Sequence, residues 1–458
     1  MSLENAVAAL QKVATGHDRT ADVARRRAGP AKLLLLGYLA YTIIGWILLS
    51  LPAAHEDVAV SALDNLFIAV SAVSTTGLAT VDTATSYTFF GELVVLLLIQ
   101  FGGLGYMTLG SFTFLAIQAK LNRTQEQTAR TAFALPKDVA PAFFIRSVVV
   151  FTLATEAIGA GFLYLIFRAD GLEDALWSAI FHSVSAFCTA GFSLYPDSFV
   201  RFADDVAVNV TIAVLSILGS MGFIIVADAY RRIVGRKSHF GFTSKVIFRM
   251  TALLIGGGTL LILVAEPSIG ALPPYERLMA AFFQAMTAST TVGFNTLAIG
   301  GISDAVLIVM LVLMVIGASP SGTGGGMKTT SFAALIALVR STLKGRDSIR
   351  FFKREVHDTQ LNLAATTLCT YLGVLCVALY LLFLTETGIA FDVMTFEAVS
   401  ALGTVGLSMG ATGELSPLGK LIIIVLMLIG RLGVFTFGLA LAVPDETREE
   451  ESDDDLAL

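Results

Sequence analysis

The sequence predicts an all-α integral membrane protein. We expect four tandem helix–re-entrant loop–helix units around a pseudo-fourfold central pore, with eight spanning helices. Three observations lead to this prediction. The 458 residues are 55% hydrophobic and only 14% charged, whereas soluble domains carry about 25% charged residues. Several apolar stretches are long enough to cross about 30 Å of hydrocarbon as helices. A short motif, Thr-x-Gly, recurs four times at the ends of apolar segments.

Long apolar stretches supply the expected spanning helices. A transmembrane β-barrel would instead show alternating segments of about ten residues. The eighth expected helix is interrupted after Ile316, as described below. The other seven stretches are residues 33–51, 93–115, 143–167, 206–227, 247–265, 363–384 and 418–443.

Positive charges are concentrated in four segments of the chain, at residues 25–32, 120–146, 231–249 and 340–354. Loops rich in Lys and Arg stay on the cytoplasmic side of a membrane, so we expect these segments and both termini in the cytoplasm. The loops between them are acidic and are expected to face outward. Their carboxylates either raise the local cation concentration or are ordinary solvated loop charges.

The Thr-x-Gly motif belongs to a longer internal repeat, which becomes visible when the four copies are aligned on their glycines. The threonine stands two positions before the glycine in each copy, and an alanine stands five positions before it. A serine or threonine stands six positions before the glycine, and a phenylalanine ten positions before it. The aligned glycines are Gly77, Gly191, Gly293 and Gly406, and the aligned phenylalanines are Phe67, Phe181, Phe283 and Phe396.

Each repeat has the same order of elements. A long apolar helix is followed by a polar outer loop and a short amphipathic segment, such as residues 63–74 or 391–403. A segment of about 12 residues cannot span a bilayer, so it is interpreted as a re-entrant helix. The motif closes it, and a second long helix returns to the cytoplasm. The predicted divisions are a cytoplasmic tail at 1–31, pore units at 32–120, 121–235, 236–345 and 346–443, and an acidic tail at 444–458.

The four motifs predict a cation filter made of backbone oxygens. Backbone inside a membrane must be hydrogen-bonded or must line a water-filled cavity. Glycine allows conformations that turn successive carbonyls inward, and a ring of carbonyls can replace the water shell of a monovalent cation. The C-terminal dipole of each short helix also favours a cation. The predicted filter residues are Thr75, Thr76, Gly77, Leu78, Thr189, Ala190, Gly191, Phe192, Thr291, Val292, Gly293, Phe294, Thr404, Val405, Gly406 and Leu407.

The second long helices carry a further aligned glycine, at Gly102, Gly219, Gly317 and Gly430. In the fourth unit this glycine is followed by Arg431. An arginine inside an apolar helix is costly and usually faces the protein interior or water, so we expect it on the pore side, below the filter. It is interpreted as an electrostatic barrier to cations or a partner of the gate. The alternative is a structural charge that pairs with carbonyls at a helix end.

The third unit departs from the pattern with the run GASPSGTGGGMKTTSF, which follows Ile316. This many glycines and a proline cannot remain helical, and irregular backbone is tolerated at membrane depth only where it lines a cavity or is buried. We therefore expect a flexible gating loop at 317–328 that obstructs the path below the filter. The predicted gate residues are Gly317, Ser319, Pro320, Gly322, Gly324, Gly325, Gly326, Lys328 and Arg431.

Three polar side chains lie in apolar segments without an assigned role. Glu156 is either an ion ligand or an internal hydrogen-bonding partner. His182 and Glu397 lie on the short segments, at equivalent or adjacent faces, and are interpreted as structural.

These motifs carry a resemblance to a known family. The four segments look like degenerate copies of the potassium-channel signature Thr-Val-Gly-Tyr-Gly, without its last glycine. One chain with four such units, over residues 32–443, resembles the Trk/Ktr/HKT superfamily of potassium transporters. Only a polar stretch precedes Leu33, whereas TrkH-type subunits carry two more helices there, so the resemblance is closest to the bacterial Ktr-type pore subunit, KtrB. Some plant relatives with serine at the first filter glycine admit sodium; Gly77 favours potassium.

The resemblance implies the pore-forming subunit of a bacterial potassium uptake system in the cytoplasmic (inner) membrane, not an enzyme. K+ is then the transported ion and the sole metal, bound at the filter. The implied partners are a second copy of the chain, membrane lipid and a cytosolic RCK-type (KtrA-like) ring, with no nucleic acid. ATP or ADP would bind that ring, and this chain would hold no cofactor.

The alternative is a Na+-permeable or Na+/H+-coupled, TrkH-like member, and Na+ as an activator stays open. Residues 340–354 either dock the ring or are ordinary cytoplasmic charge.

Overall fold

The computed structural model describes residues 31–56, 59–105, 140–233, 239–346, 348–351 and 354–441. The predicted tails at 1–31 and 444–458 therefore lie outside the described residues, apart from Ala31. The basic segment at 120–146 lies mostly outside them as well.

Long helices open each of the four units. They are Ala31–Leu49, α7 (Pro141–Ala169), α11 (Phe242–Ala265) and α15 (Asp358–Thr385). Within the described part of the chain these are the four single helices that are long and apolar enough to cross a membrane. Their outward faces expose large apolar side chains such as Leu165 (65% exposed) and Val264 (77% exposed), as expected for helices that face lipid.

Short helices follow the long ones, as the repeat predicts. They are α2 (Ala62–Val73), α8 (Ala175–Phe187), α12 (Pro274–Thr290) and α16 (Phe391–Gly403). Ser61 caps helix α2, because its side chain accepts a hydrogen bond from the Asp64 amide, a common N-terminal arrangement. The C-terminal halves of all four are buried. Each short helix therefore directs its C-terminal end into the protein.

The second helices of the units are α4 (Phe89–Leu104), α9 (Val206–Ser220), α13 (Asp304–Val315) and α17 (Pro417–Leu432). The prediction of continuous apolar helices at 206–227 and 418–443 is wrong. Helix α9 is followed by α10 (Phe223–Ile233) after an 89° bend, and α17 is followed by α18 (Val434–Leu441). Gly222 (φ +87°) and Gly433 (φ +81°) stand at these breaks in the left-handed region, which L side chains rarely adopt.

Shorter elements complete the described chain. The two strands pair antiparallel and are a small exception to the predicted all-α fold. The elements are α3 (Thr83–Ser86), α14 (Thr329–Thr342), the strands β1 (Arg350–Phe351) and β2 (Arg354–Glu355), and the 3-10 turns Pro52–Ala54, Val200–Phe202, Ile299–Gly301 and Thr412–Glu414.

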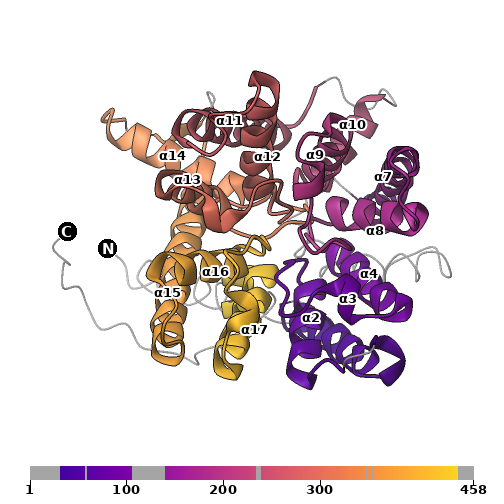
Figure 1. The fold of residues 1–458 in the computed structure, drawn as a ribbon. Helices are drawn as coiled ribbons and strands as arrows, with labels where there is room; N and C mark the ends of the chain where they lie inside the picture. The colour runs from indigo at the N-terminus through magenta and orange to yellow at the C-terminus, as the bar shows by residue number, and fades with distance from the viewer. Residues whose placement is uncertain are drawn as a thin grey trace, which may run out of the picture.

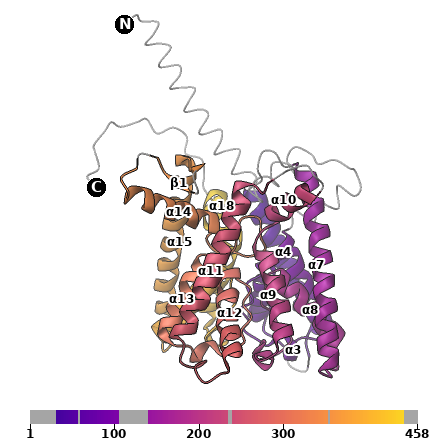
Figure 2. The ribbon, with the colours of Figure 1, turned by 90° about the horizontal axis from the view of Figure 1, so that it is seen from above.

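The helices lie in four groups, in chain order, around a centre where the segments after the short helices meet (Figure 1). Seen from above, α10, α14, α18 and β1 lie at one end of the molecule and α3 at the other (Figure 2). The basic residues of α10 and α14 thus lie at the end opposite Asp82, next to α3. This separation of charge follows the pattern expected from the sequence.

The core has two large apolar clusters. One is built mainly from units one and two and includes Phe181 and Phe192. The other is built mainly from units three and four and includes Phe396 and Leu407. Residues from the first and third units cross into the opposite cluster, for example Phe67 and Phe283. The aligned phenylalanines of the repeat thereby join the two halves around the centre.

Candidate functional site: a ring of four backbone segments

The threonine of each motif has a left-handed backbone. The φ angles are 52° at Thr75, 51° at Thr189, 59° at Thr291 and 48° at Thr404. This conformation is rare for a β-branched residue and stores strain of about 1–3 kcal/mol at each position. Strain of this kind tends to gather at functional sites. The same unusual conformation at all four copies makes a shared role more credible than four independent helix ends.

The same backbone hydrogen bond closes the turn after the short helix in all four repeats. The amide of the residue after the motif threonine turns back and donates to the carbonyl of the serine or threonine that stands six positions before the motif glycine, five residues before the donor. The four bonds are Thr76 N to Ser71 O (2.8 Å), Ala190 N to Ser185 O (2.8 Å), Val292 N to Thr287 O (3.2 Å) and Val405 N to Ser400 O (2.8 Å). All four chain reversals therefore have one geometry.

The four motif glycines contact one another in cyclic order. A Cβ atom on Gly77 would collide with the Ala190 carbonyl, and one on Gly191 would lie 2.5 Å from the Val292 carbonyl oxygen. Likewise Gly293 meets the Val405 carbonyl, and Gly406 meets the Thr76 carbonyl, which closes the ring. Each glycine also has a positive φ, between 68° and 94°. Any side chain here would be strained and would press on the carbonyl of the next segment.

A cavity of about 350 Å³ opens beside this ring and is lined by all four motif glycines. Asp82, Ser193, Asn295 and Ser408 also line it. The cavity is therefore on the α3 side of the ring, which the charge pattern predicts to face outward.

The sixteen predicted filter residues fall into three roles. The threonines and the residues after them are buried, and the glycines make the ring. The fourth residue of each segment anchors it in the apolar core: Phe192 and Phe294 in one cluster, Leu78 and Leu407 in the other. The structure thus brings all sixteen together, from four distant parts of the chain.

Polar side chains on three of the short helices hold the segments that follow the ring. His182 Nε2 lies 3.0 Å from Ser193 Oγ. Gln284 contacts Thr296 Oγ1 at 3.2 Å. Glu397 accepts hydrogen bonds from Ser408 Oγ (2.5 Å), Thr412 Oγ1 (2.6 Å) and the Met409 amide (3.0 Å). All three stand nine positions before a motif glycine, where the first unit has Ile68.

The sequence did not reveal that these side chains occupy one aligned position of the repeat. These residues, Ile68, His182, Gln284 and Glu397, share a position but not a chemistry, so they do not align by residue type. The interpretation of His182 and Glu397 as structural agrees with these contacts. Glu156, by contrast, lies behind the second segment, where Cys188 Sγ is 3.6 Å from its Oε1 atom.

Glycines of the second helices allow close packing against the short helices. A Cβ atom on Gly102 would collide with the Val73 carbonyl, and one on Gly219 would collide with the Phe187 carbonyl. Gly430 packs in the same way on the Leu402 carbonyl. The third unit differs, because Gly317 packs on Gly325 of the glycine-rich loop. The loop therefore takes the place that a short-helix end has in the other units.

The glycine-rich loop contacts all four motif threonines from below the ring. Thr323 accepts a hydrogen bond from Thr75 through its carbonyl (3.3 Å) and one from Thr189 through its hydroxyl (3.1 Å). Gly324 packs against the Thr291 hydroxyl and Gly325 against the Thr404 hydroxyl. Gly324 and Gly325 therefore leave no room for side chains.

Several hydrogen bonds fix the loop in this position. Thr323 also donates to the carbonyl oxygens of Phe187, through its hydroxyl, and Gly219, through its amide, both at 3.1 Å. The Ser319 amide donates to the Ser220 carbonyl at 3.0 Å. Lys328 folds back and donates from Nζ to the Gly324 carbonyl at 2.8 Å.

Residues at the bend between α9 and α10 also contact the glycine-rich loop. Gly222 contacts the Pro320 carbonyl, Gly322 contacts the Ser220 carbonyl, and the Phe223 amide donates to Ser321 O at 3.0 Å. Gly326 packs closely against Gly317, so the two ends of the loop meet. Every predicted gate residue in the loop thus lies in one compact segment below the ring.

Arg431 joins this segment to two other elements. Its guanidinium donates to Thr75 Oγ1 at 2.9 Å, to Tyr38 Oη at 3.3 Å and to the carbonyls of Thr323 and Gly102. Gly102 belongs to the last turn of α4, so Arg431 pairs with carbonyls at a helix end and also with the loop. Both interpretations of this arginine therefore find contacts, and Thr323 and Tyr38 are partners that the sequence did not reveal.

Comparison with known proteins decides the family. The profile of the family TrkH, described as cation transport protein, matches residues 39–450. The chain belongs to the TrkH family of cation transport proteins. Since the predicted superfamily includes this family, the resemblance seen in the sequence is confirmed.

Several curated relatives match nearly the whole chain. The Ktr system potassium uptake protein B of Vibrio alginolyticus is 36% identical, over 92% of this chain and 93% of its own length. The protein of the same name from Bacillus subtilis is 34% identical, over 92% and 95%. The potassium/sodium uptake protein NtpJ of Enterococcus hirae is 34% identical, over 92% and 94%.

The crystal structure of the potassium transporter TrkH from Vibrio parahaemolyticus has the same fold. It superposes with a TM-score of 0.72 at 21% identity, over 91% of this chain and 85% of that one. The predicted helical membrane fold is therefore confirmed at the level of the family fold. The count of eight spanning helices and exact fourfold pseudosymmetry stay predictions.

Proposed function

We propose that this protein is the pore-forming subunit of a bacterial potassium uptake system and that the ring of four Thr-x-Gly segments is its selectivity filter. The observation that carries this proposal is the cyclic contact of Gly77, Gly191, Gly293 and Gly406 beside one cavity. The names of the relatives at 34–36% identity, which are potassium uptake proteins, support the choice of ion.

In this proposal K+ enters from the α3 side and loses water at the ring. Carbonyl oxygens of the sixteen filter residues replace that water. The C-terminal ends of the four short helices add the negative end of their dipoles. Entry is downhill on the membrane potential, which is worth about 2.3 kcal/mol per charge at 100 mV. Because the four segments differ in sequence, we expect fewer well-formed ion sites than in a symmetric channel.

The loop at 317–328 is the proposed gate. Thr323, Gly324 and Gly325 lie against the four motif threonines, so an ion that leaves the ring would meet them. Arg431 adds a positive charge at the same level and repels cations. Movement of the loop away from the threonines would open the path to the cytoplasm.

Potassium uptake by the Gly293→Ser variant tests the filter. Serine at 293 would meet the Val405 carbonyl and adopt an unfavourable φ, so we expect growth rescue of an uptake-deficient bacterium at low potassium to be lost. Gly388→Ser is the matched control, because Gly388 has a φ of +103° but open space around it. Equal rescue by Gly293→Ser and wild type, at equal membrane expression, would contradict the filter.

A second candidate is a Na+-permeable or Na+/H+-coupled transporter of the same family. The name of the relative NtpJ, a potassium/sodium uptake protein, favours this candidate. Flux of Rb+ and Na+ into vesicles of purified protein separates the two. Rb+ flux that needs no Na+ supports the first, and net Na+ flux supports the second.

The assembly is also part of the proposal. We place the protein in the bacterial inner membrane with both termini in the cytoplasm, as a homodimer with a cytosolic RCK-type ring that binds ATP or ADP. The name of two relatives, "Ktr system potassium uptake protein B", supports a complex of more than one component. Co-purification of a nucleotide-binding subunit, and its loss when the charges at 346–354 are neutralised, would test the docking surface.

A further inference from the structure

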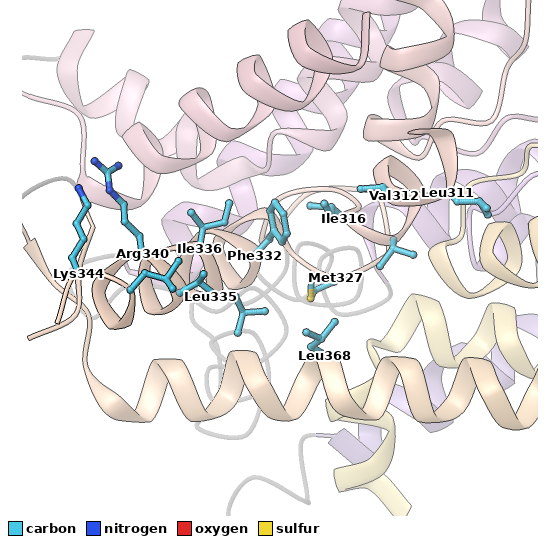
Figure 3. Close-up of a pocket in the computed structure, with 13 residues that line it drawn as sticks. Leu311, Val312, Ile316, Met327, Phe332, Leu335, Ile336, Arg340, Lys344 and Leu368 are labelled. Carbon is cyan, nitrogen blue, oxygen red and sulfur yellow. The ribbon is translucent and has the colours of Figure 1, made fainter. Parts of the chain in front are cut away.

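A long apolar groove lies on the side of the molecule, away from the ring. It has a volume of about 680 Å³ and is formed by α13, α14 and α15 (Figure 3). Eleven of its 13 lining residues are apolar, among them Val312, Phe332 and Leu368. The groove therefore suits a hydrocarbon chain along most of its length.

The two remaining lining residues are both cationic. Arg340 and Lys344 are four residues apart and lie together at one end of the groove, opposite Leu311 (Figure 3). Both are exposed, and neither side chain forms a hydrogen bond or an ion pair with another of the described residues. From Phe332 to Arg340 helix α14 rises about 12 Å. The groove thus pairs a long apolar body with a cationic end.

This arrangement selects one class of ligand. The cationic end lies at the same end of the molecule as α10 and β1, where the basic segments gather (Figure 2), and is therefore placed at the cytoplasmic membrane surface. Basic pockets between membrane helices at that surface bind anionic lipid headgroups. A zwitterionic lipid has no net negative charge to offer to the two side chains. A soluble anion would leave the apolar body unfilled.

The inner wall of the groove belongs to the gate. Ile316, which directly precedes the loop at 317–328, and Met327, near the end of that loop, line it. The Met327 amide donates to the Val315 carbonyl at 3.0 Å, and the Ala318 amide donates to the Gly325 carbonyl at 3.0 Å. These bonds pin the ends of the loop together behind the groove. An occupant between α13 and α14 would pack on that pinned segment.

We propose that the groove binds an anionic phospholipid of the bilayer, with its acyl chain on Phe332 and Leu368 and its phosphate on Arg340 and Lys344. Bound lipid holds the loop in its position below the ring and so lowers transport. The second part rests on the proposed function, whereas lipid binding itself does not.

Photo-crosslinking in proteoliposomes tests the binding. A photoactivatable phosphatidylglycerol should label the peptides that carry α14 and Leu368, and unlabelled phosphatidylglycerol should compete at least five-fold better than phosphatidylcholine. The double variant R340Q/K344Q should lose at least five-fold of the labelling. The matched control R232Q/K245Q removes two charges from α10 and α11, outside the groove, and should keep it.

A second variant separates the apolar contribution from the charges. Leu335→Trp narrows the groove and leaves Arg340 and Lys344 in place, so labelling should again fall. Equal competition by the two lipids, or labelling unchanged in both R340Q/K344Q and Leu335→Trp, would overturn the proposal. A change of oligomeric state in these variants would overturn it too, because it would mean that a second copy of the chain covers the groove.

Rb+ flux at increasing phosphatidylglycerol content tests the coupling to transport. Flux of the wild-type protein should fall as the anionic lipid rises, and flux of R340Q/K344Q should stay constant. A wild-type flux that ignores the lipid, with labelling intact, would overturn the coupling alone. Absence of any Rb+ flux, with labelling intact, would count against the proposed function and not against the lipid site.

Discussion

The hydroxyl of Thr323 offers the sharpest test of the gate. Replacement by valine keeps the branched shape and removes one oxygen. The structure assigns two hydrogen bonds to that oxygen: it donates to the Phe187 carbonyl and accepts from Thr189 Oγ1, each at 3.1 Å. The single proton of the Thr189 hydroxyl can turn to the Cys188 carbonyl, which lies 2.8 Å from Thr189 Oγ1. The variant therefore loses contacts that hold the loop and leaves the ring segment itself bonded.

The size of the effect follows from the bond to Phe187, because the Thr189 proton has the Cys188 carbonyl as another acceptor. A buried hydrogen bond contributes about 1 kcal/mol net, so the docked position of the loop loses about 1 kcal/mol. At 1.4 kcal/mol per factor of ten, the ratio of docked to undocked loop falls about five-fold. If the docked loop limits transport, the flux of Thr323→Val should rise by up to that factor.

Rb+ uptake into proteoliposomes, normalised to folded protein, measures the change. Thr259→Val is the matched control, because the Thr259 hydroxyl bonds only to the Ile255 carbonyl of its own helix at 2.7 Å. Its flux should equal that of the wild type. An unchanged or lower flux for well-folded Thr323→Val would show that this loop position does not limit transport.

Three further predictions use the same flux assay and thermal unfolding. Arg431→Gln removes the charge and the contacts with the loop, so flux should rise; unaltered flux would argue for a purely structural arginine. Glu397→Gln weakens the bonds to Ser408 and Thr412, so the preference for Rb+ over Na+ should fall about ten-fold, the factor for about 1.4 kcal/mol; a preserved ratio would remove Glu397 from the filter's support. Gly222→Ala forces a side chain into a left-handed position against Pro320, at a cost of about 1–2 kcal/mol. Its unfolding temperature should drop and its flux should rise, whereas a flux rise without loss of stability would need another cause.

The ring of four segments, which is the proposed filter, was predictable because the columns of the internal repeat have local structural causes. The serine or threonine column supplies a hydroxyl, which in two units accepts a hydrogen bond from the motif glycine: Gly77 N to Ser71 Oγ and Gly406 N to Ser400 Oγ, both at 3.1 Å. The glycine column marks a positive φ and a close neighbour, as between Gly77 and Ala190. Because the same local geometry occurs four times, its residue pattern can be recognised within this one sequence.

The breaks in the second helices were harder to foresee. Gly222 and Gly433 lie inside apolar stretches that continue on both sides, and hydropathy alone favours one long helix. The bend at Gly222 depends on the Pro320 carbonyl packed against it, about 100 residues away in sequence. Because that contact forms only in the tertiary structure, the residues around Gly222 do not predict the bend.

The role of Thr323 escaped the sequence for a similar reason. Its partners Thr75, Thr189 and Phe187 come from two other units. In the sequence it is one hydroxyl in a run of glycines, and glycines account for the irregular loop without it. The signal was present, because it is the sole side chain larger than hydrogen between Gly322 and Gly326.

The most direct test of the central claim is an experimental map of the protein with Rb+ or Tl+ in place of K+. Anomalous scattering should reveal ions on the axis enclosed by Gly77, Gly191, Gly293 and Gly406, with unequal strengths along it. Ion density that lies elsewhere in a transport-competent preparation, or an empty ring at saturating ion concentration, would contradict the account.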